Sequence, residues 1–237
     1  MKILALAATE REVRSLKEQL RLTEVYNDRF TAYAFENIAI DVLVSGMGMV
    51  AKAYHLGKHL QMEKYDLALN IGIAGSFCKK IALGSVVNVV QDQFSEMGAE
   101  DGDRFIDIAG MNFKEFDTYP YAKGILKNDT DFNQYGIAGL KQVCGITSNT
   151  IHGKQESISE IIKHFNPDIE TMGGAAFLYA CLCEKIPCAQ IRSASNYVEV
   201  RDRSKWEVHL AIDQLTLEVM KIFSYLNKQK ASSNENE

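Results

Sequence analysis

Two stretches of the sequence carry polar side chains whose type and spacing could support chemistry. In ATEREV (8–13), Thr9 is followed three residues later by Glu12, the spacing of a capping box in which the carboxylate reaches back to the start of a helix. In RSASNYVEVRDR (192–203), small residues lead to Asn196, whose amide could contact a ligand or tie down a loop. Taken alone, a helix cap and a structural amide are the simpler interpretations of these two side chains.

Two glycine-rich turns follow apolar runs and suggest main-chain contacts to a ligand. SGMGMVA (45–51) fits the pattern G-x-G-x-x-A, a weak sign of dinucleotide binding. That reading needs an acidic residue about twenty positions later, which Asp66 fits only loosely. NIGIAGS (70–76) repeats the arrangement after the next apolar run. Two such turns in succession favour a ligand held by backbone N–H groups from several strands.

A glycine pair stands where another apolar run meets a helical pattern, in IETMGGAAF (169–177). Gly173 and Gly174 could cradle an anion, provide a hinge, or mark the place of a missing side chain. Glycine permits each of these because it has no Cβ atom. The pair alone does not decide between the three interpretations.

The signs of a metal site are weak. His55 and His59 have the i,i+4 spacing of two ligands on a helix, but no Glu follows His55 as in a metalloprotease and no third ligand is evident. A helix face at the surface or at a subunit contact is the preferred interpretation. We expect no metal and no organic cofactor.

Composition excludes several classes of partner. The formal net charge of -5 and the pI near 5.6 argue against a nucleic-acid ligand, which requires clustered Lys and Arg. No stretch approaches the roughly 18 apolar residues that span a membrane. The five cysteines lack the paired spacing of a secreted disulfide framework, so they indicate reduced core thiols and a cytoplasmic location.

Apolar runs alternate with segments of helical period, which predicts one domain built on a largely parallel sheet covered on both faces. Strands are expected at 2–8, 38–45, 67–75, 85–92, 142–147, 168–172 and 188–195. Helices are expected at 10–20, 49–62, from about 155, at 175–185 and at about 205–226. The polar, aromatic segment 93–137 should form a loop-rich excursion, and residues 228–237 a frayed tail after a domain at 1–227. Ligands of such sheets bind at the carboxyl ends of strands, where the five stretches quoted above lie.

The order of these stretches resembles the nucleoside phosphorylase and nucleosidase superfamily over about residues 1–226. The resemblance implies a three-layer α/β/α sandwich with a central, mostly parallel mixed sheet, assembled as a homodimer or larger oligomer. Within the superfamily, three segments are similar to the futalosine hydrolases, nucleosidases of an alternative menaquinone pathway. They are MGAEDGDRF (97–105), GITSNTIHG (145–153) and IRSASNYVEVRDRSKW (191–206).

One residue bears on whether the attacking group is water or phosphate. A phosphorylase must hold a dianion, which calls for arginine. Phosphorylases of the superfamily commonly carry Arg two positions before the glycine turn, where this sequence has Asn70 as nucleosidases do. The expected reaction is therefore hydrolysis of a small purine nucleoside, with futalosine as the expected substrate.

The resemblance also assigns roles to individual residues. Glu12 would activate water, and Asn196 would hydrogen-bond the leaving base, because a side-chain amide can donate to purine N7 and also interact with a 6-oxo group. That favours hypoxanthine over adenine, since methylthioadenosine nucleosidases carry Asp at this position. The other expected substrate-binding positions are Ser45, Ala74, Gly75, Asn149, Thr150, Ile151, Met172 and Gly173.

Gly173 departs from the superfamily, whose members carry a ribose-binding Glu immediately after the Met of this strand end. Glu170 is three residues earlier, so strand geometry should place it on the other face. A charge-assisted hydrogen bond to a hydroxyl is worth about 1.5–3 kcal/mol, so its loss should impair or alter catalysis. Two alternatives stay open: a methylthioadenosine or adenosylhomocysteine nucleosidase, and a catalytically silent nucleoside-binding protein.

Overall fold

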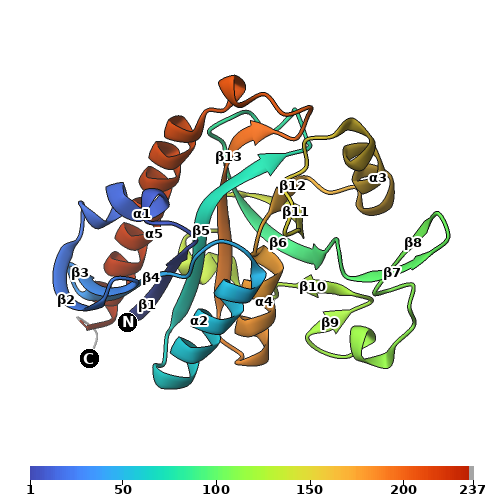
Figure 1. Ribbon diagram of the computed structural model, residues 1–237. Helices are drawn as coiled ribbons and strands as arrows, with labels where there is room; N and C mark the ends of the chain where they lie inside the picture. Colours follow the sequence, from blue (N-terminus) through green and yellow to red (C-terminus); the bar gives the residue numbers. More distant parts are fainter. Residues whose placement is uncertain (235–237) are drawn as a thin grey trace.

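The computed structural model describes residues 1–234, and residues 235–237 lie outside the described part. A large mixed sheet occupies the centre of the molecule (Figure 1). Its strands are β1 (Lys2–Ala7), β2 (Arg21–Asn27), β3 (Phe30–Phe35), β4 (Ile38–Val44), β5 (Leu67–Ser76), β6 (Val86–Phe94), β9 (Tyr121–Ala122), β10 (Ile125–Lys127), β11 (Lys141–Thr147), β12 (Ile169–Thr171) and β13 (Cys188–Tyr197). The strands β4, β1, β5 and β13 are parallel to one another and form its middle.

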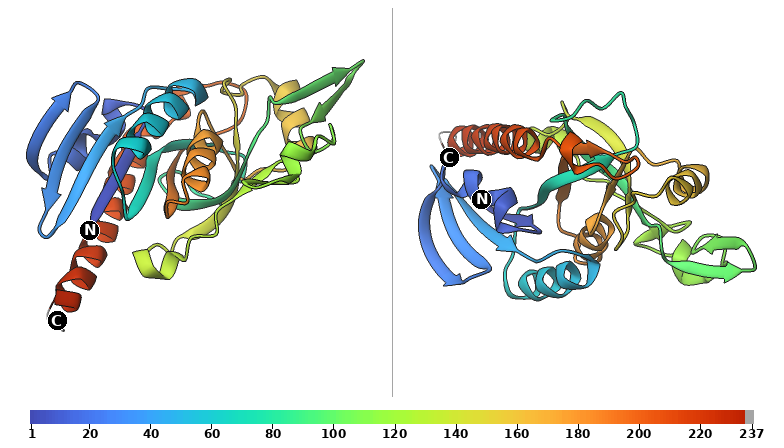
Figure 2. Two further views of the ribbon diagram at one scale, coloured as in Figure 1. Left: turned by 90° about the horizontal axis from the view of Figure 1, so that it is seen from below. Right: turned by 45° about the horizontal axis from the view of Figure 1, so that its top comes forward.

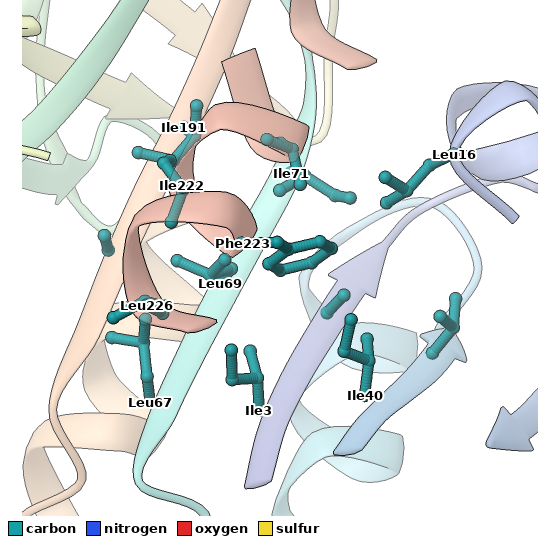
Figure 3. Close-up of a cluster of buried hydrophobic side chains, with 14 of the residues drawn as sticks. Ile3, Leu16, Ile40, Leu67, Leu69, Ile71, Ile191, Ile222, Phe223 and Leu226 are labelled. Carbon is teal, nitrogen blue, oxygen red and sulfur yellow. The ribbon is translucent and has the colours of Figure 1, made fainter. Parts of the chain in front are cut away.

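Helices cover both faces of this sheet, which explains why its inner strands are apolar on both sides. α1 (Glu10–Lys17) and α5 (Val208–Asn234) pack on one face, where the Phe223 ring lies over residues of β1 and β5 (Figure 3). α2 (Met49–Met62) and α4 (Gly174–Cys183) pack together on the other face. The predicted three-layer sandwich is confirmed, and Figure 2 shows its helices from two further directions.

Five strands close on themselves at one end of the sheet. β5 pairs with β13, β13 with β6, β6 with β11, β11 with β12, and β12 returns to β5. Two of these pairs, β12 with β5 and β13 with β6, are antiparallel, whereas the other three are parallel. The ring brings the ends of β5, β12 and β13 together, although these strands are far apart in the sequence.

The structure adds elements that the sequence pattern did not predict. The hairpin of β2 and β3 forms one edge of the sheet, and every residue of β2 is exposed, so its apolar signal was weak. The expected excursion at 93–137 contains the hairpin of β7 (Gly98–Asp101) and β8 (Arg104–Asp107), which projects from the body (Figure 1). It also contains β9, β10 and two short 3-10 helices, Lys114–Asp117 and Phe132–Tyr135.

The end of the chain differs from the expected tail. α5 continues to Asn234, so residues 228–234 are helical, and the rest of the predicted tail lies outside the described residues. All five cysteines are free, but Cys144 and Cys183 are exposed, so the expectation of core thiols is wrong for these two. Within residues 1–234, every helix is too short or too polar to cross a lipid bilayer.

Candidate active site

A cavity of about 320 Å³ opens at the carboxyl ends of β1, β5, β12 and β13. The starts of α1, α2 and α5 complete its wall. This is the edge of the sheet at which α/β proteins bind ligands. Of the residues expected to bind substrate, the cavity is lined by Glu12, Ala74, Gly75, Thr150, Ile151, Met172, Gly173 and Asn196.

Glu12 is a fixed carboxylate in the wall of this cavity. One oxygen, Oε2, accepts hydrogen bonds from the backbone N–H and the hydroxyl of Thr9, both at 2.9 Å. The other oxygen, Oε1, accepts from the backbone N–H of Ile73 at 3.1 Å. The residue is only 7% exposed. The capping contact therefore does not compete with a role in the cavity, since it holds the carboxylate in place there.

A buried arginine lies beside this carboxylate. Arg192 of β13 also lines the cavity, and a Cβ atom at Gly72 would clash with both its Nη1 atom and Glu12 Oε1. The glycine at 72 is thus needed for close approach rather than for an unusual backbone angle. Burial lowers the pKa of Arg192, while the charge of Glu12 opposes that shift. Among the described residues, the Nε atom of Arg192 has no hydrogen-bond partner.

A second buried cation, Lys52 of α2, lines the same cavity. Its Nζ atom donates to Asn70 Oδ1 at 2.8 Å. Burial, assisted by the nearby Arg192, lowers the pKa of Lys52 to about 7. Neither cation was expected from the sequence. A readable signal existed for Lys52, because it shares one helix face with Leu56 and Leu60, the other buried residues of α2.

Lys52 is one end of a chain of buried polar side chains that leads away from the cavity. Asn70 Nδ2 donates to Gln190 Oε1 at 2.9 Å, and Gln190 Nε2 donates to Asp92 Oδ2 at 2.8 Å. Burial raises the pKa of Asp92 to about 6, although hydrogen bonds from Gln190 and Thr147 act against this. Asn70 is fully buried and held from both sides. Two cations in the cavity also mean that Asn70 alone does not exclude an anionic ligand.

Glycine is present at positions 173 and 174 for different structural reasons. A Cβ atom at residue 173 would lie 2.9 Å from Lys52 Cε and 3.2 Å from Lys52 Cδ. At residue 174, the first of α4, a Cβ atom would clash with Asp92 and Gln190 of the polar chain. Gly174 therefore lets α4 begin against buried polar groups of the sheet, whereas Gly173 leaves room for the lysine side chain.

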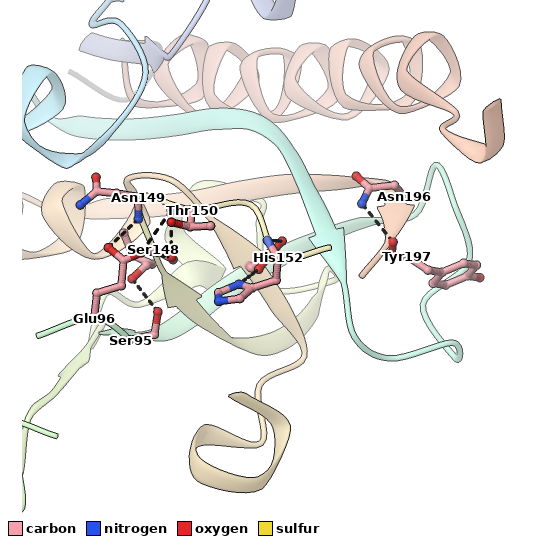
Figure 4. Close-up of polar contacts among 10 residues, drawn as sticks. Ser95, Glu96, Ser148, Asn149, Thr150, His152, Asn196 and Tyr197 are labelled. Carbon is pink, nitrogen blue, oxygen red and sulfur yellow. Dashed lines mark hydrogen bonds and ion pairs between the residues drawn. The ribbon is translucent and has the colours of Figure 1, made fainter. Parts of the chain in front are cut away.

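Asn196 enters the cavity through an irregularity in β13. The pairing of β13 with β5 shifts between Ala194 and Asn196, a β-bulge that changes the direction of the side chains near it. Asn196 Oδ1 accepts from the Ser195 hydroxyl at 2.8 Å. Its Nδ2 atom donates to the Tyr197 carbonyl at 3.1 Å, as Figure 4 shows. The amide is thereby oriented with its NH₂ group near Gly75.

Glu170 lines the cavity, so the prediction that it turns to the other face is wrong. β12 is only three residues long and ends the ring against β5, which opposes Glu170 to Gly75. Both carboxylate oxygens are occupied: Oε1 accepts from the His152 backbone N–H at 3.2 Å, and Oε2 is 2.6 Å from His152 Nδ1. This hydrogen bond raises the pKa of His152. Glu170 therefore fixes the loop that carries His152.

The same loop is held at its other end by Glu96. Its oxygens accept from the Ser148 hydroxyl at 2.5 Å, from Asn149 N at 3.0 Å and from Thr150 N at 3.2 Å (Figure 4). These bonds place Thr150 and Ile151 on the cavity. Asn149 is exposed and is not part of the lining, contrary to its expected role.

Ser45 also lies outside the lining of the described cavity. Its side chain is fully buried, and its hydroxyl is 3.1 Å from the Ala7 carbonyl, so it joins β4 to β1. The dinucleotide interpretation fails on geometry. Gly46 and Gly48 do adopt positive φ angles, of 90° and 86°, but Asp66 precedes β5 at the opposite edge of the sheet. There it accepts a hydrogen bond from the Lys2 backbone at 2.6 Å.

No group of three or more His, Cys, Asp or Glu side chains in the described chain is placed to hold a metal ion. A second cavity of about 220 Å³ shares Asn196 and Trp206 with the first. Its other walls include His152, Tyr197 and Arg201, from two of the three segments that are similar to the futalosine hydrolases. The two cavities together offer room beyond Asn196 for a substituent of a ligand.

The comparisons with known proteins agree on one family. The model of the Phosphorylase superfamily matches residues 2–227. Futalosine hydrolase of Thermus thermophilus is 26% identical over 185 residues, 77% of this chain and 80% of that protein. A 5′-methylthioadenosine/S-adenosylhomocysteine nucleosidase of Colwellia psychrerythraea is 27% identical over 224 residues, 89% of each chain.

Solved structures share the fold at lower identity. The crystal structure of the Colwellia psychrerythraea nucleosidase in complex with adenine superposes with a TM-score of 0.78 at 21% identity, covering 95% of this chain and 96% of that one. Futalosine hydrolase of Helicobacter pylori gives a TM-score of 0.77 at 16% identity, covering 95% of this chain and 98% of that one.

Proposed function

Because this chain belongs to the Phosphorylase superfamily, we propose that it is a purine nucleoside N-ribosyl hydrolase whose substrate is futalosine. The products would be hypoxanthine and dehypoxanthine futalosine, in menaquinone biosynthesis. The observation that carries the proposal is Glu12, a buried carboxylate fixed by three hydrogen bonds at the wall of the cavity, with the Arg192 guanidinium nearby. That arrangement suits a site which activates water beside a developing cation.

Glu12 is the general base in this proposal. Its carboxylate accepts a proton from water as the water oxygen forms a bond to the anomeric carbon of the ribose. The bond from that carbon to the purine nitrogen breaks, and its electron pair leaves with the base. The guanidinium of Arg192 orients the water through N–H donors, since it lies next to the same Glu12 oxygen.

Asn196 serves the leaving base. Its NH₂ group has one hydrogen directed to the Tyr197 carbonyl and a second that can donate to purine N7. A base that is hydrogen-bonded at N7 carries the electron pair of the broken bond more easily. Neutral amides accept as well as donate, which suits a 6-oxopurine such as hypoxanthine. The cavity beyond Asn196 is where we place the distal substituent of the nucleoside.

The test is release of free base from futalosine, inosine and methylthioadenosine, each with and without phosphate. Hypoxanthine released from futalosine without phosphate is the expected result. Base released only with phosphate would show a phosphorylase and overturn the proposal. This outcome is worth testing because Lys52 and Arg192, the two cations of the cavity, could hold a phosphate ion. Faster release of adenine from methylthioadenosine would favour the second nucleosidase. Tight binding without release would favour a silent nucleoside-binding protein.

We also propose that the chain acts in the cytoplasm as a homodimer. Met47, Val50 and Tyr54 are 67%, 83% and 66% exposed on one face of the α2 region, an apolar surface that a second copy could cover. Met47 lines the cavity as well, so the partner would lie at its mouth. Light scattering should give the mass of two chains, and Val50→Glu should shift it toward one.

A further inference from the structure

Lys52 occupies a position that the proposed reaction does not explain. It is 2% exposed, yet it lines the cavity together with Glu12 and Gly173. Its Cε and Cδ atoms pass 2.9 Å and 3.2 Å from the place that a Cβ atom would take at residue 173. The lysine stem therefore fills the space beside Gly173, where superfamily members were expected to present a carboxylate to the ribose.

The hydrogen bonds of this ammonium leave donors for a ligand. A lysine ammonium has three N–H donors, and one of them is directed to Asn70 Oδ1. Burying such a charge is costly unless it is paired or hydrogen-bonded, and here a neutral amide is its hydrogen-bond partner. A sugar hydroxyl in the cavity would accept a second of these N–H groups.

We propose that Lys52 is the sugar-binding residue of this site, and that its ammonium donates to a ribose hydroxyl at the position where the family resemblance implies a carboxylate. The inference rests on the proposed nucleosidase function and names the residue that replaces the missing Glu. Gly173 is then one half of a paired exchange: the carboxylate is absent at 173, and a group of opposite charge reaches the same space from α2.

The exchange has an electrostatic consequence for catalysis. Cleavage of the glycosidic bond builds positive charge on the ribose. A carboxylate stabilises that charge, whereas an ammonium binds the hydroxyl but opposes the charge. Lys52 should therefore contribute more to substrate binding than to the chemical step. Restoring Gly173→Glu alone should not reproduce a carboxylate site, because Lys52 Nζ would pair with the new side chain.

The experiment is a thermodynamic cycle that combines a substitution at Lys52 with the removal of one hydroxyl from the substrate. Base release is measured for wild type and Lys52→Met with inosine, 2′-deoxyinosine and 3′-deoxyinosine, and Lys58→Met on the exposed side of the same helix is the control. Removing the contacted hydroxyl should cost wild type about tenfold in kcat/KM, and cost Lys52→Met less than twofold. The loss should be mainly in KM. Lys58→Met should behave as wild type.

Equal losses in wild type and Lys52→Met for both deoxynucleosides would overturn the inference while leaving the nucleosidase function intact. If wild type releases no base from inosine, the same cycle is read from dissociation constants by calorimetry. The proposed function fails separately, if wild type releases no base from futalosine either. A hydroxyl-dependent difference there would still support Lys52, and failure to bind any nucleoside would refute it. Circular dichroism and the variant Lys52→Gln, which keeps a donor, separate misfolding from a lost contact.

Discussion

The two faces of the central sheet differ although the same strands form both. On the face covered by α5, β5 and β13 present Leu69, Ile71 and Ile191 to an apolar core. One residue away along the same strands, Asn70 and Gln190 belong to the buried polar chain. Each side of the strand is thus used for a different purpose: apolar burial stabilises the fold on one face, and buried charge supports a site on the other.

The first prediction tests the carboxylate of Glu12, the charged group on which the proposed reaction depends most. Glu12→Gln keeps the shape of the side chain but cannot accept a proton from water. Base release should fall about 10²- to 10⁴-fold, the range that general bases contribute. Glu10→Gln, at an exposed site in the first turn of the same helix, is the control. A fall of less than tenfold in Glu12→Gln would remove Glu12 from the proposed mechanism.

The second prediction applies the same logic to the apolar face. Phe223 is a residue of α5 and is fully buried in the core between this helix and the sheet. Phe223→Ala leaves a cavity there and should lower the free energy of unfolding by about 3–5 kcal/mol. The kcat of the molecules that remain folded should not change. Urea unfolding with activity measured per folded protein checks both parts. Loss of activity without loss of stability would contradict the division between the faces.

The third prediction concerns the stability cost of the charged face. The pKa of Lys52 is lowered to about 7 in the folded protein, whereas in the unfolded chain it keeps its ordinary value of 10.5. Between those values the unfolded state binds more protons, so the free energy of unfolding should rise with pH. The cost is fully present below pH 7. In Lys52→Met this rise, on the order of a few kcal/mol, should disappear. Denaturant unfolding from pH 6 to 10 measures the difference, and parallel curves would contradict it.

The fourth and smallest effect is a change of preference at the base. Asn196→Asp replaces a neutral amide by the residue expected in methylthioadenosine nucleosidases. The ratio of kcat/KM for inosine to that for adenosine should fall by about tenfold, as one hydrogen bond is exchanged for another. The carboxylate can keep the contact with Ser195 but cannot donate to the Tyr197 carbonyl, so the free energy of unfolding should fall by about 1–3 kcal/mol. An unchanged ratio would show that Asn196 does not read the base.

The sequence predicted the fold well where periodicity is strong. β1 and β5 are continuous apolar runs, and α2 has a clear helical period, so their bounds agree closely with expectation. The hairpin of β2 and β3 was not found, because an exposed edge strand has little apolar signal. The fold class follows from the order of such elements. The closure of β5, β12, β11, β6 and β13 into a ring does not, since it depends on contacts between distant strands.

The site was predictable only in part, and the reason lies in burial. Glu12 and Asn196, which both line the cavity, were expected there because each stands near a junction between a strand and a helix. Arg192 and Lys52 were missed because they lie inside regular elements, a strand and a helix, where charged residues are ordinarily on the solvent side. The position of Ser45 against Ala7 depends on the pairing of β4 with β1, which spacing in the sequence does not give.

The polar chain behind Lys52 has only one arrangement in which every bond is made. An ammonium can only donate and a carboxylate can only accept, so Lys52 and Asp92 fix the orientation of both amides between them. Moving one proton from Lys52 to Asp92 would allow the opposite arrangement, with Asn70 and Gln190 both turned over. Neither amide should therefore tolerate replacement by the corresponding carboxylic acid. Asn70→Asp or Gln190→Glu, though nearly identical in shape, would set two acceptors against each other in the interior.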